Sequence, residues 1–298
     1  MIIETTNLAK RFGSTEAVRG LNLSVPAGLI CGFLGRNGAG KSTTIKMLLG
    51  ITRPSSGKGR VFGLPIDDPA ASLEIRRRTG YVGEDKRLYG YMTGEQMIRF
   101  TRSLYPRWKM DWERQLLREF AVPLNRKVKT YSKGMRTKLA LLLSLARGVD
   151  LLILDEPTEG LDPVMIEQVL QALVRAAAEG TSVFFSSHQI AEVEQIADHV
   201  SVIHNGRLLL DGALDRLKES YRRVNLVFPN RAPEKEFSMP GVKGIEADRH
   251  TLSVFASHNV DDIVDRARAL DAASVEVFPL TLREIYLESL KEEQHALV

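Results

Sequence analysis

The sequence predicts an α/β fold with a mixed, mainly parallel sheet, an antiparallel β edge and a small C-terminal α+β domain. Residues 29–34 and 151–154 are short, nearly unbroken apolar runs, which are typical of strands buried on both faces of a parallel sheet. Strand and helix patterns alternate around these runs, as they do in parallel α/β sheets. Beyond residue 215 short strand patterns are interrupted by prolines, which predicts a separate domain.

The first elements are predicted as strands followed by one helix. Residues 21–25 alternate between apolar and polar side chains, which predicts a strand, and a Pro-Ala-Gly sequence at 26–28 ends it. After the buried strand at 29–34, we expect a loop at 35–40 and a helix at 41–49, with the next glycine as its C-cap.

The middle of the chain carries two strong helical patterns. From residue 94 to residue 120, apolar and aromatic side chains share one side and basic side chains the other, until Pro123 interrupts the pattern. Residues 132–147 predict a second helix, closed by Gly148. The elements expected after the strand at 151–154 are a helix at 164–178, a strand at 181–186, a helix at 190–197 and a hairpin at 200–210 around Asn205-Gly206.

The chain is predicted to form a main domain over residues 1–215 and an accessory α+β domain over residues 216–298. The accessory domain is expected to contain strands at 222–228, 251–256 and 274–278, and helices at 260–270 and 281–290. It carries no chemical motif. Because the chain has no internal repeat, an arrangement that needs two copies of a motif requires two chains.

The composition excludes several classes of protein. With 298 residues, 44% hydrophobic and 26% charged, the chain is of ordinary globular composition rather than disordered. The single cysteine, Cys31, excludes an internal disulfide and a cysteine-rich zinc site. No apolar run approaches the ~20 residues that span a bilayer, and the sequence opens Met-Ile-Ile-Glu without the positive region of a signal peptide. We therefore expect a soluble intracellular chain.

Basic residues are concentrated between residues 73 and 140. This segment contains 17 Lys or Arg and 7 Asp or Glu, whereas the whole chain carries a formal net charge of +4. Such a segment can face anionic lipid headgroups, nucleic acid or water. The charge distribution leaves all three alternatives open.

A glycine-rich loop gives the most specific chemical signal. The sequence Gly35-Arg36-Asn37-Gly38-Ala39-Gly40-Lys41-Ser42 matches G-x-x-x-x-G-K-[ST], the Walker A or P-loop pattern. Glycines let consecutive backbone N–H groups point at one anion, and the following helix adds its positive N-terminus. We expect Lys41 to reach the β- and γ-phosphates of a nucleotide and the Ser42 hydroxyl to bind Mg²⁺.

Two acids and a histidine follow predicted strands. Asp155 and Glu156 come directly after the strand at 151–154, and the carboxyl ends of parallel strands open onto the crevice where ligands bind. Asp155 is therefore expected to hold Mg²⁺ through water, and Glu156 to orient or deprotonate the water that attacks the γ-phosphate. His188, beyond the strand at 181–186, is by itself compatible with a structural role or with a contact to the γ-phosphate.

Taken together, these motifs resemble the nucleotide-binding subunits of ABC transporters, which have a P-loop NTPase fold, over residues 2–215. The family's signature, usually Leu-Ser-Gly-Gly-Gln, corresponds to Tyr-Ser-Lys-Gly-Met at 131–135, just upstream of the carboxylate strand. Ser132 is a suitable N-cap for the helix that follows it. Residues 279–287 resemble the closing helix of exporter-type subunits, the branch that includes antibiotic, multidrug and lipid exporters.

The resemblance implies that ATP is held between two subunits. In the family, the signature of one subunit, here Ser132, Lys133 and Gly134, meets the γ-phosphate bound by the other. The further residues implied are Phe12 stacked on adenine, Thr43 at the end of the phosphate loop, Asp162 in the loop that crosses to the other subunit, and His188 as the switch. A helical subdomain, about residues 88–145, is implied to dock on the membrane subunits near the anionic inner leaflet.

Two departures from the family pattern matter for the reaction. Glu84 stands where the family has a Gln that joins Mg²⁺ and the attacking water to the membrane partner. A carboxylate can still bind Mg²⁺, but it adds negative charge beside the phosphates, so a different metal dependence or hydrolysis rate is expected. Lys133 replaces the first signature glycine and either adds a cation near the γ-phosphate or points into water. Phe12 stands for the commoner Tyr and keeps its stacking face.

The resemblance implies an ATPase that uses ATP and Mg²⁺ to energise a separate polytopic permease, with export as the favoured direction. The expected catalytic residues are Lys41, Glu84, Glu156 and His188. The expected partners are a second nucleotide-binding subunit, identical or paralogous, and the permease, which would hold this chain on the cytoplasmic face of the cell membrane. No specific nucleic acid is expected.

Two alternatives belong to other classes of protein. The first is an ABC ATPase that acts on ribosomes or nucleic acid. Such proteins usually carry two nucleotide-binding halves or a long coiled-coil insertion, and this sequence has neither. The second is a P-loop kinase or GTP switch. Kinases do not need a second anion-binding helix start at Ser132, and the sequence has no Asn-Lys-x-Asp guanine motif.

Overall fold

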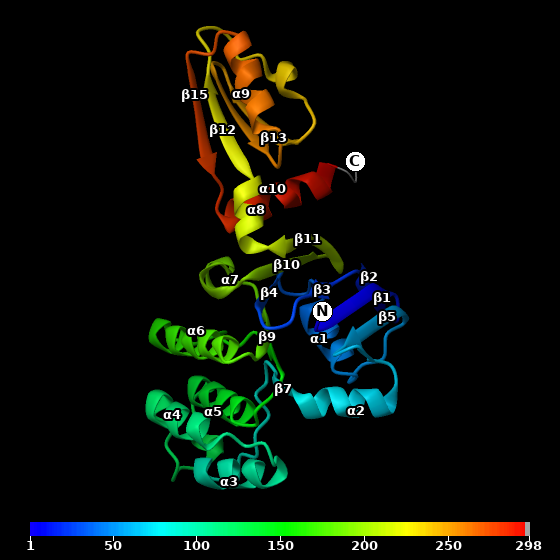
Figure 1. The fold of residues 1–298 in the computed structure, drawn as a ribbon, viewed down its shortest axis with the longest axis vertical. Coiled ribbons are helices and arrows are strands. Elements are labelled where there is room, and N and C mark those ends of the chain that lie inside the picture. The colour runs from blue at the N-terminus through cyan, green and yellow to red at the C-terminus, as the bar shows by residue number, and fades with distance from the viewer. Residues whose placement is uncertain (296–298) are drawn as a thin grey trace. The chain divides into compact units, whose positions relative to one another are not determined.

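The computed structural model describes residues 1–295, with side chains described to residue 291. The chain divides into two compact units, with the division after Leu208. This division lies inside strand β11 (Arg207–Ala213), a few residues before the predicted domain boundary at 215. Figure 1 labels the elements. Among residues 1–295, no helix is both long enough and apolar enough to cross a bilayer.

A six-stranded sheet forms the centre of the first unit, in the order β11-β10-β4-β9-β8-β7. Its other strands are β4 (Ile30–Leu34), β7 (Thr79–Val82), β8 (Leu151–Asp155), β9 (Ser182–Ser187) and β10 (His199–His204). The neighbouring strands from β10 to β7 are all parallel. Every residue of β4, β8 and β9 is buried, which explains the nearly unbroken apolar runs of β4 and β8. The carboxyl ends of these parallel strands therefore meet at one edge.

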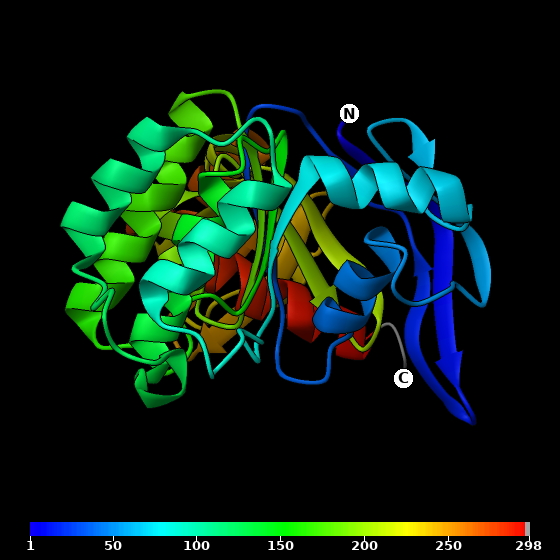
Figure 2. The ribbon, with the colours of Figure 1, turned by 90° about the horizontal axis from the view of Figure 1, so that it is seen from below.

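Helices cover both faces of this sheet, as Figures 1 and 2 show. Those of the first unit are α1 (Lys41–Leu48), α2 (Pro69–Arg78), α3 (Gly94–Leu104), α4 (Met110–Phe120), the 3₁₀ helix η1 (Val128–Thr130), α5 (Lys133–Leu145), α6 (Pro163–Ala178) and α7 (Ile190–Ile196). Helices α3 to α6 lie on one side, and α1, α2 and the antiparallel strands on the other. The single helical stretch predicted at 94–120 is wrong, because residues 105–109, which include Pro106, separate two helices.

The predicted antiparallel strands near the N-terminus form a second sheet. Its order is β2-β1-β5-β6, with β3 paired to β1. The strands are β1 (Ile3–Phe12), β2 (Thr15–Leu21), β3 (Ser24–Val25), β5 (Ser56–Val61) and β6 (Leu64–Pro65). The predicted single strand at 21–25 is therefore wrong. Asn22 interrupts it, since its side chain accepts the Asn7 N–H at 2.8 Å and donates to the Gly20 carbonyl at 3.2 Å.

The second unit is an antiparallel sheet in the order β13-β14-β12-β15 with helices. Its elements are α8 (Leu214–Ser220), β12 (Arg222–Val227), η2 (Glu234–Phe237), β13 (Val242–Asp248), β14 (Thr251–Ala256), α9 (Val260–Ala269), β15 (Ser274–Pro279) and α10 (Leu282–His295). Buried side chains of β12, β14 and α9, among them Val224, Val254 and Ile263, form its core. The α+β arrangement is as predicted. Strand β13 was not predicted from the sequence, because its residues are half-buried or exposed and show no apolar pattern.

Candidate functional site

The phosphate-loop sequence lies between β4 and α1, at the carboxyl edge of the central sheet. Gly38 and Gly40 have φ values of 83° and 109°, in the left-handed region that side chains disfavour. A Cβ at Gly40 would also lie 2.5 Å from the Ala17 carbonyl oxygen, so the path of the loop requires glycine there. The first N–H groups of α1 have no partner within the helix and lie next to a cavity of about 360 Å³. This cavity is bordered by Asn37, Gly38, Gly40, Lys41, Ser42, Thr43, Glu84 and Glu156, among others.

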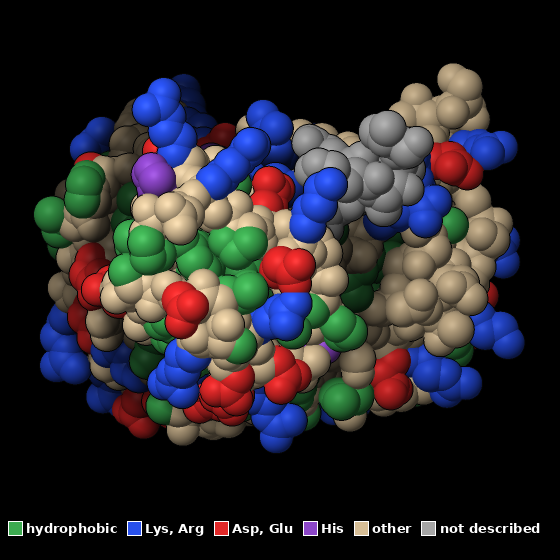
Figure 3. Space-filling view, turned by 90° about the horizontal axis from the view of Figure 1, so that it is seen from above, with side chains coloured by type: hydrophobic (Ala, Val, Ile, Leu, Met, Phe, Trp, Pro, Cys, Tyr) green, Lys and Arg blue, Asp and Glu red, His purple; other side chains and the backbone are tan. Residues whose placement is uncertain are grey.

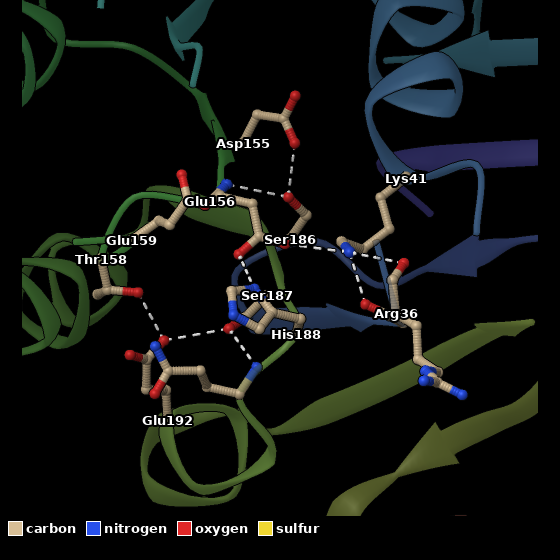
Figure 4. A network of polar contacts seen from close by, with 12 residues as sticks. Arg36, Lys41, Asp155, Glu156, Thr158, Glu159, Ser186, Ser187, His188 and Glu192 are labelled. Atoms are coloured by element: carbon tan, nitrogen blue, oxygen red, sulfur yellow. Dashed lines mark hydrogen bonds and ion pairs between the residues drawn. The ribbon is translucent and has the colours of Figure 1, made fainter. Parts of the chain in front are cut away.

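Lys41 is held in a buried ion pair with Glu156. The side chain is 5% exposed, and its Nζ lies 3.0 Å from Glu156 Oε1. The same ammonium donates hydrogen bonds to the carbonyl oxygens of Gly35 at 2.5 Å and Arg36 at 3.2 Å (Figure 4). The structure thus brings together the predicted phosphate-binding lysine and the predicted base, although 115 positions separate them in the sequence. The rest of the loop, including Ala39, connects β4 to α1.

His188 holds the other oxygen of the same carboxylate. Its Nδ1 lies 2.9 Å from Glu156 Oε2. On the neighbouring strand, Ser186 Oγ donates to Asp155 Oδ1 at 2.8 Å and accepts the Glu156 backbone N–H at 3.1 Å. The end of β9 therefore fixes both acids at the end of β8, as Figure 4 shows.

A further buried acid, Glu192 of α7, was not among the residues predicted from the sequence. It accepts the hydroxyl of Thr158 at 2.6 Å and the hydroxyl of Ser187 at 3.1 Å. Burial raises the pKa of the Glu192 carboxyl above its usual value. Glu192 thereby joins the segment after Glu156 to the residue before His188. No motif in the sequence marks Glu192, and its role is identified by burial and these hydrogen bonds alone.

The predicted Mg²⁺ ligands border a second cavity, of about 540 Å³. Ser42, Glu84 and Asp155 line it, and all three offer the hard oxygen donors that Mg²⁺ prefers. Burial, followed by the charge of Asp155, raises the pKa of the neighbouring Tyr81 to about 12. Among the side chains of residues 1–291, no group of three or more His, Cys, Asp or Glu is arranged to hold a metal alone. This donor set fits an ion that keeps water and takes phosphate oxygens as its other ligands.

A buried lysine lies beside Glu84. Lys86 is 6% exposed, and its Nζ donates to the Glu156 carbonyl oxygen at 3.2 Å. Burial, with repulsion from Lys133, lowers the pKa of Lys86. No pattern in the sequence indicates this contact, because a lysine in a loop is usually exposed.

The signature residues begin helix α5. Ser132 is its N-cap, since Oγ accepts the Met135 N–H at 3.2 Å, as predicted. Lys133 does not simply point into water, because its Nζ lies 3.0 Å from the Glu159 carboxylate. That hydrogen bond lowers the pKa of Glu159. Gly134 is buried, and a Cβ there would lie 2.3 Å from Met165 Sδ.

The remaining predicted residues lie outside this cluster. Phe12, at the end of β1, is 51% exposed, with Lys10 Nζ 5.0 Å from its ring centre. Asp162 is the N-cap of α6 and accepts the Met165 N–H at 2.9 Å. Phe12, Ser132 and Asp162 border neither of the two cavities around Lys41 and Asp155. One chain therefore does not bring them to the phosphate loop.

Many basic side chains of residues 73–140 are paired with acids. Arg78 and Arg107 lie 2.7 and 3.6 Å from Asp150, and Lys109 lies 3.7 Å from Glu179. Such exposed pairs are worth little energy, but they reduce the free positive charge of this segment. Only Asp150, Glu179 and Glu159 among these partners lie outside the segment, so the pairs offset part of the basic excess and leave the rest exposed to lipid, nucleic acid or water.

Comparison with known proteins identifies relatives of this chain. A family model described as ABC transporter matches residues 18–159. The chain is 37% identical over 278 residues to the daunorubicin/doxorubicin resistance ATP-binding protein DrrA of Streptomyces peucetius, covering 90% of this chain and 83% of the relative. It is 39% identical over 225 residues to the bacitracin transport ATP-binding protein BcrA of Bacillus licheniformis, covering 74% and 73%. A solved structure of an ATP-binding subunit of an ABC transporter matches with a TM-score of 0.67 and 30% identity, over 74% of this chain and 92% of that one.

Proposed function

Because the chain belongs to the ABC transporter family, as an ATP-binding subunit, we propose that it hydrolyses ATP to energise a separate membrane-spanning permease. The observation that carries this proposal is the buried contact of Lys41 with Glu156 and His188 beside the phosphate loop. This contact puts a cation, a candidate base and a residue that orients the base at one point. Such a combination is suited to phosphoryl transfer to water.

In the proposed reaction each group has a distinct task. The N–H groups of the loop and of the α1 N-terminus bind phosphate oxygens, and Lys41 neutralises the β- and γ-phosphates. Glu156 orients and deprotonates the attacking water. His188 contacts the second carboxylate oxygen of Glu156 and so fixes its orientation. Mg²⁺, bound by Ser42 and Asp155 with Glu84, would supply positive charge to the phosphate oxygens.

We further propose that two subunits enclose each ATP. The N-terminus of α5 can bind an anion, and it is formed by Ser132, Lys133 and Gly134. These residues border neither cavity near Lys41 of the same chain. A second copy or a paralogue can bring them to the γ-phosphate. The exposed ring of Phe12 would then stack on adenine, and Asp162 would lie at the junction of the two subunits.

Export is the proposed direction of transport. One relative is named for daunorubicin and doxorubicin resistance, and another for bacitracin transport. Residues 1–215 would act as the ATP-binding domain, and the helical subdomain at 88–145 would contact the permease on the cytoplasmic side of the membrane. Residues 216–298 would be an accessory domain.

A glutamate-to-glutamine substitution at the proposed base tests the hydrolytic role. Glu156→Gln should lower the ATPase rate of the full chain by at least about 100-fold, because positioned bases contribute this much or more. It should also retain ATP and form a dimer with Mg-ATP, measured by light scattering. Glu167→Gln is the matched control, since this exposed glutamate of α6 accepts hydrogen bonds from glutamine side chains on α6 and α7. Hydrolysis by Glu156→Gln at the wild-type rate would refute the role of Glu156.

The same preparation tests the nucleic-acid alternative. Several basic side chains of residues 73–140 pair with acids, such as Arg78 with Asp150, and Figure 3 shows basic and acidic side chains mixed over the one face that it draws. We expect no salt-sensitive binding of RNA or DNA near physiological ionic strength. Co-purification of a polytopic membrane protein would support transport, and co-purification of ribosomes would contradict it.

A further inference from the structure

Lys86 is a buried cation that takes no part in the proposed reaction steps. It is 6% exposed and lies in a turn in which its own N–H donates to the Gly83 carbonyl at 3.2 Å. Its φ is 43°, a left-handed conformation that costs energy for any residue with a side chain. A lysine that is both buried and in this conformation is held there by its contacts.

The contact of Lys86 is with the backbone of the proposed base. Its Nζ donates to the Glu156 carbonyl oxygen at 3.2 Å. Glu156 is also in the left-handed region, with φ 49°, so its backbone is strained at the same point. Ser186 Oγ accepts the Glu156 N–H at 3.1 Å. Ser186 thus fixes the amide side of this residue, and Lys86 fixes its carbonyl side.

Lys86 also stands among negative charges. Lys86, Glu84 and Asp155 line one cavity, and the charges of Glu84, Asp155 and Glu159 act on the Lys86 ammonium. Among the other cations nearby, Lys41 pairs with Glu156, Lys133 with Glu159 and Arg87 with Asp85. Lys46 lines the same cavity as Glu84 and Lys86. Lys86 is therefore placed to balance Glu84, the carboxylate that stands where the family has a neutral glutamine.

We propose that Lys86 is a positioning residue for Glu156, and that its charge makes a carboxylate at position 84 compatible with ATP hydrolysis. The inference rests on the proposed ATPase activity. It predicts that the effect of removing Lys86 depends on the charge at position 84, which a purely structural lysine would not show.

A double-mutant cycle in the full chain tests both parts. We would compare wild type, Lys86→Met, Glu84→Gln and the double variant by kcat and KM at saturating Mg-ATP. Loss of a charge-assisted hydrogen bond should lower kcat by about tenfold in Lys86→Met, with KM within about twofold. In the Glu84→Gln background, Lys86→Met should lower kcat by no more than about threefold.

Further variants separate charge, hydrogen bonding and folding. Arg87→Met is the matched control, because the neighbouring Arg87 side chain is 88% exposed and pairs with the exposed Asp85; its kcat should stay within about twofold of wild type. Lys86→Arg should retain more activity than Lys86→Gln, which keeps a donor without the charge. If urea titrations show that Lys86→Met is not folded, Lys86→Arg and Lys86→Gln are compared instead, each in the wild-type and the Glu84→Gln backgrounds. Their kcat values then test the charge of Lys86.

Each outcome is distinct. An unchanged kcat in Lys86→Met overturns the positioning role. An equal loss in the wild-type and the Glu84→Gln backgrounds overturns the charge role, as does equal activity of the arginine and glutamine variants. If wild type and Arg87→Met hydrolyse no ATP, the proposed function itself fails. If both hydrolyse ATP while Lys86→Met matches them, only this inference fails.

Discussion

Ser186 offers a test of how the sheet positions the two acids. Its side chain is completely buried, and its Oγ donates to Asp155 Oδ1 at 2.8 Å and accepts the Glu156 N–H at 3.1 Å. Ser186→Ala leaves a buried carboxylate oxygen and a buried N–H without this partner. Each such loss costs about 1–3 kcal/mol, so we expect the free energy of unfolding to fall by about 2–6 kcal/mol.

Urea unfolding followed by tryptophan fluorescence measures this change. The sequence has two tryptophans, Trp108 and Trp112, and both lie in the first unit, so the signal reports that unit. The midpoint should fall with an unchanged m value. Ser182→Ala, on the same strand, is the control, because its Oγ accepts one N–H, that of Gly28 at 2.8 Å. It should cost about 1 kcal/mol.

The catalytic readout separates the site from general stability. Ser186→Ala should raise the Mg²⁺ concentration for half-maximal ATPase activity several-fold, because Asp155 loses the bond that orients it. Ser182→Ala should leave that concentration unchanged. A stability loss below about 0.5 kcal/mol in Ser186→Ala, or equal Mg²⁺ dependence in the two variants, would refute the reasoning.

Two further predictions concern stability alone. Arg175 forms a two-pronged hydrogen-bonded pair with Glu119, and this pairing holds the pKa of Glu119 below its usual value of 4.5. The stabilisation is therefore present above pH 4.5 and is lost as the pH falls through the folded-state pKa. Glu119→Gln should cost at most about 1 kcal/mol at neutral pH, because the pair is a third exposed, and should flatten the acid-side decline in urea titrations. The second prediction compares two glycines. Gly63→Ala should lower the free energy of unfolding by about 1 kcal/mol, because its φ of 75° is unfavourable for a residue with a side chain while the added Cβ meets no other atom. Gly57→Ala should cost at least about 3 kcal/mol by the same assay, because its Cβ would also meet the Asn7 carbonyl at 2.0 Å; equal losses would contradict the steric argument.

The sequence predicted the elements that depend on local pattern. The buried strand at 29–34 appears as β4 and the helix at 132–147 as α5 with Ser132 as its N-cap, because unbroken apolar runs and capping side chains act locally. Strand β13 was missed and residues 21–25 were assigned to one strand. Both depend on pairing with strands far along the chain and on side-chain bonds such as that of Asn22 to Asn7.

The same distinction applies to the site. Motifs predicted Lys41, Asp155 and Glu156 as site residues, but their contacts are made between strands that only the folded sheet brings together. Ser186, Glu192 and Lys86 have no motif and are identified by burial and hydrogen bonding alone. Their positions follow from the parallel order β9-β8-β7, which the sequence pattern does not specify.

The ion pair of Lys41 with Glu156 has a consequence for ATP binding. Both side chains are buried, so neither charge can lose its partner without a large cost. When the phosphates occupy the loop, we expect Lys41 to exchange the carboxylate for phosphate oxygens and to remain neutralised. Glu156 then gives up one of its two partners and keeps His188, which leaves the Oε1 atom to accept a proton from water. Phosphate binding and release of the base are therefore one exchange at a single lysine. A substitution of Lys41 should weaken phosphate binding and leave the Glu156 Oε1 atom without its cation before ATP binds.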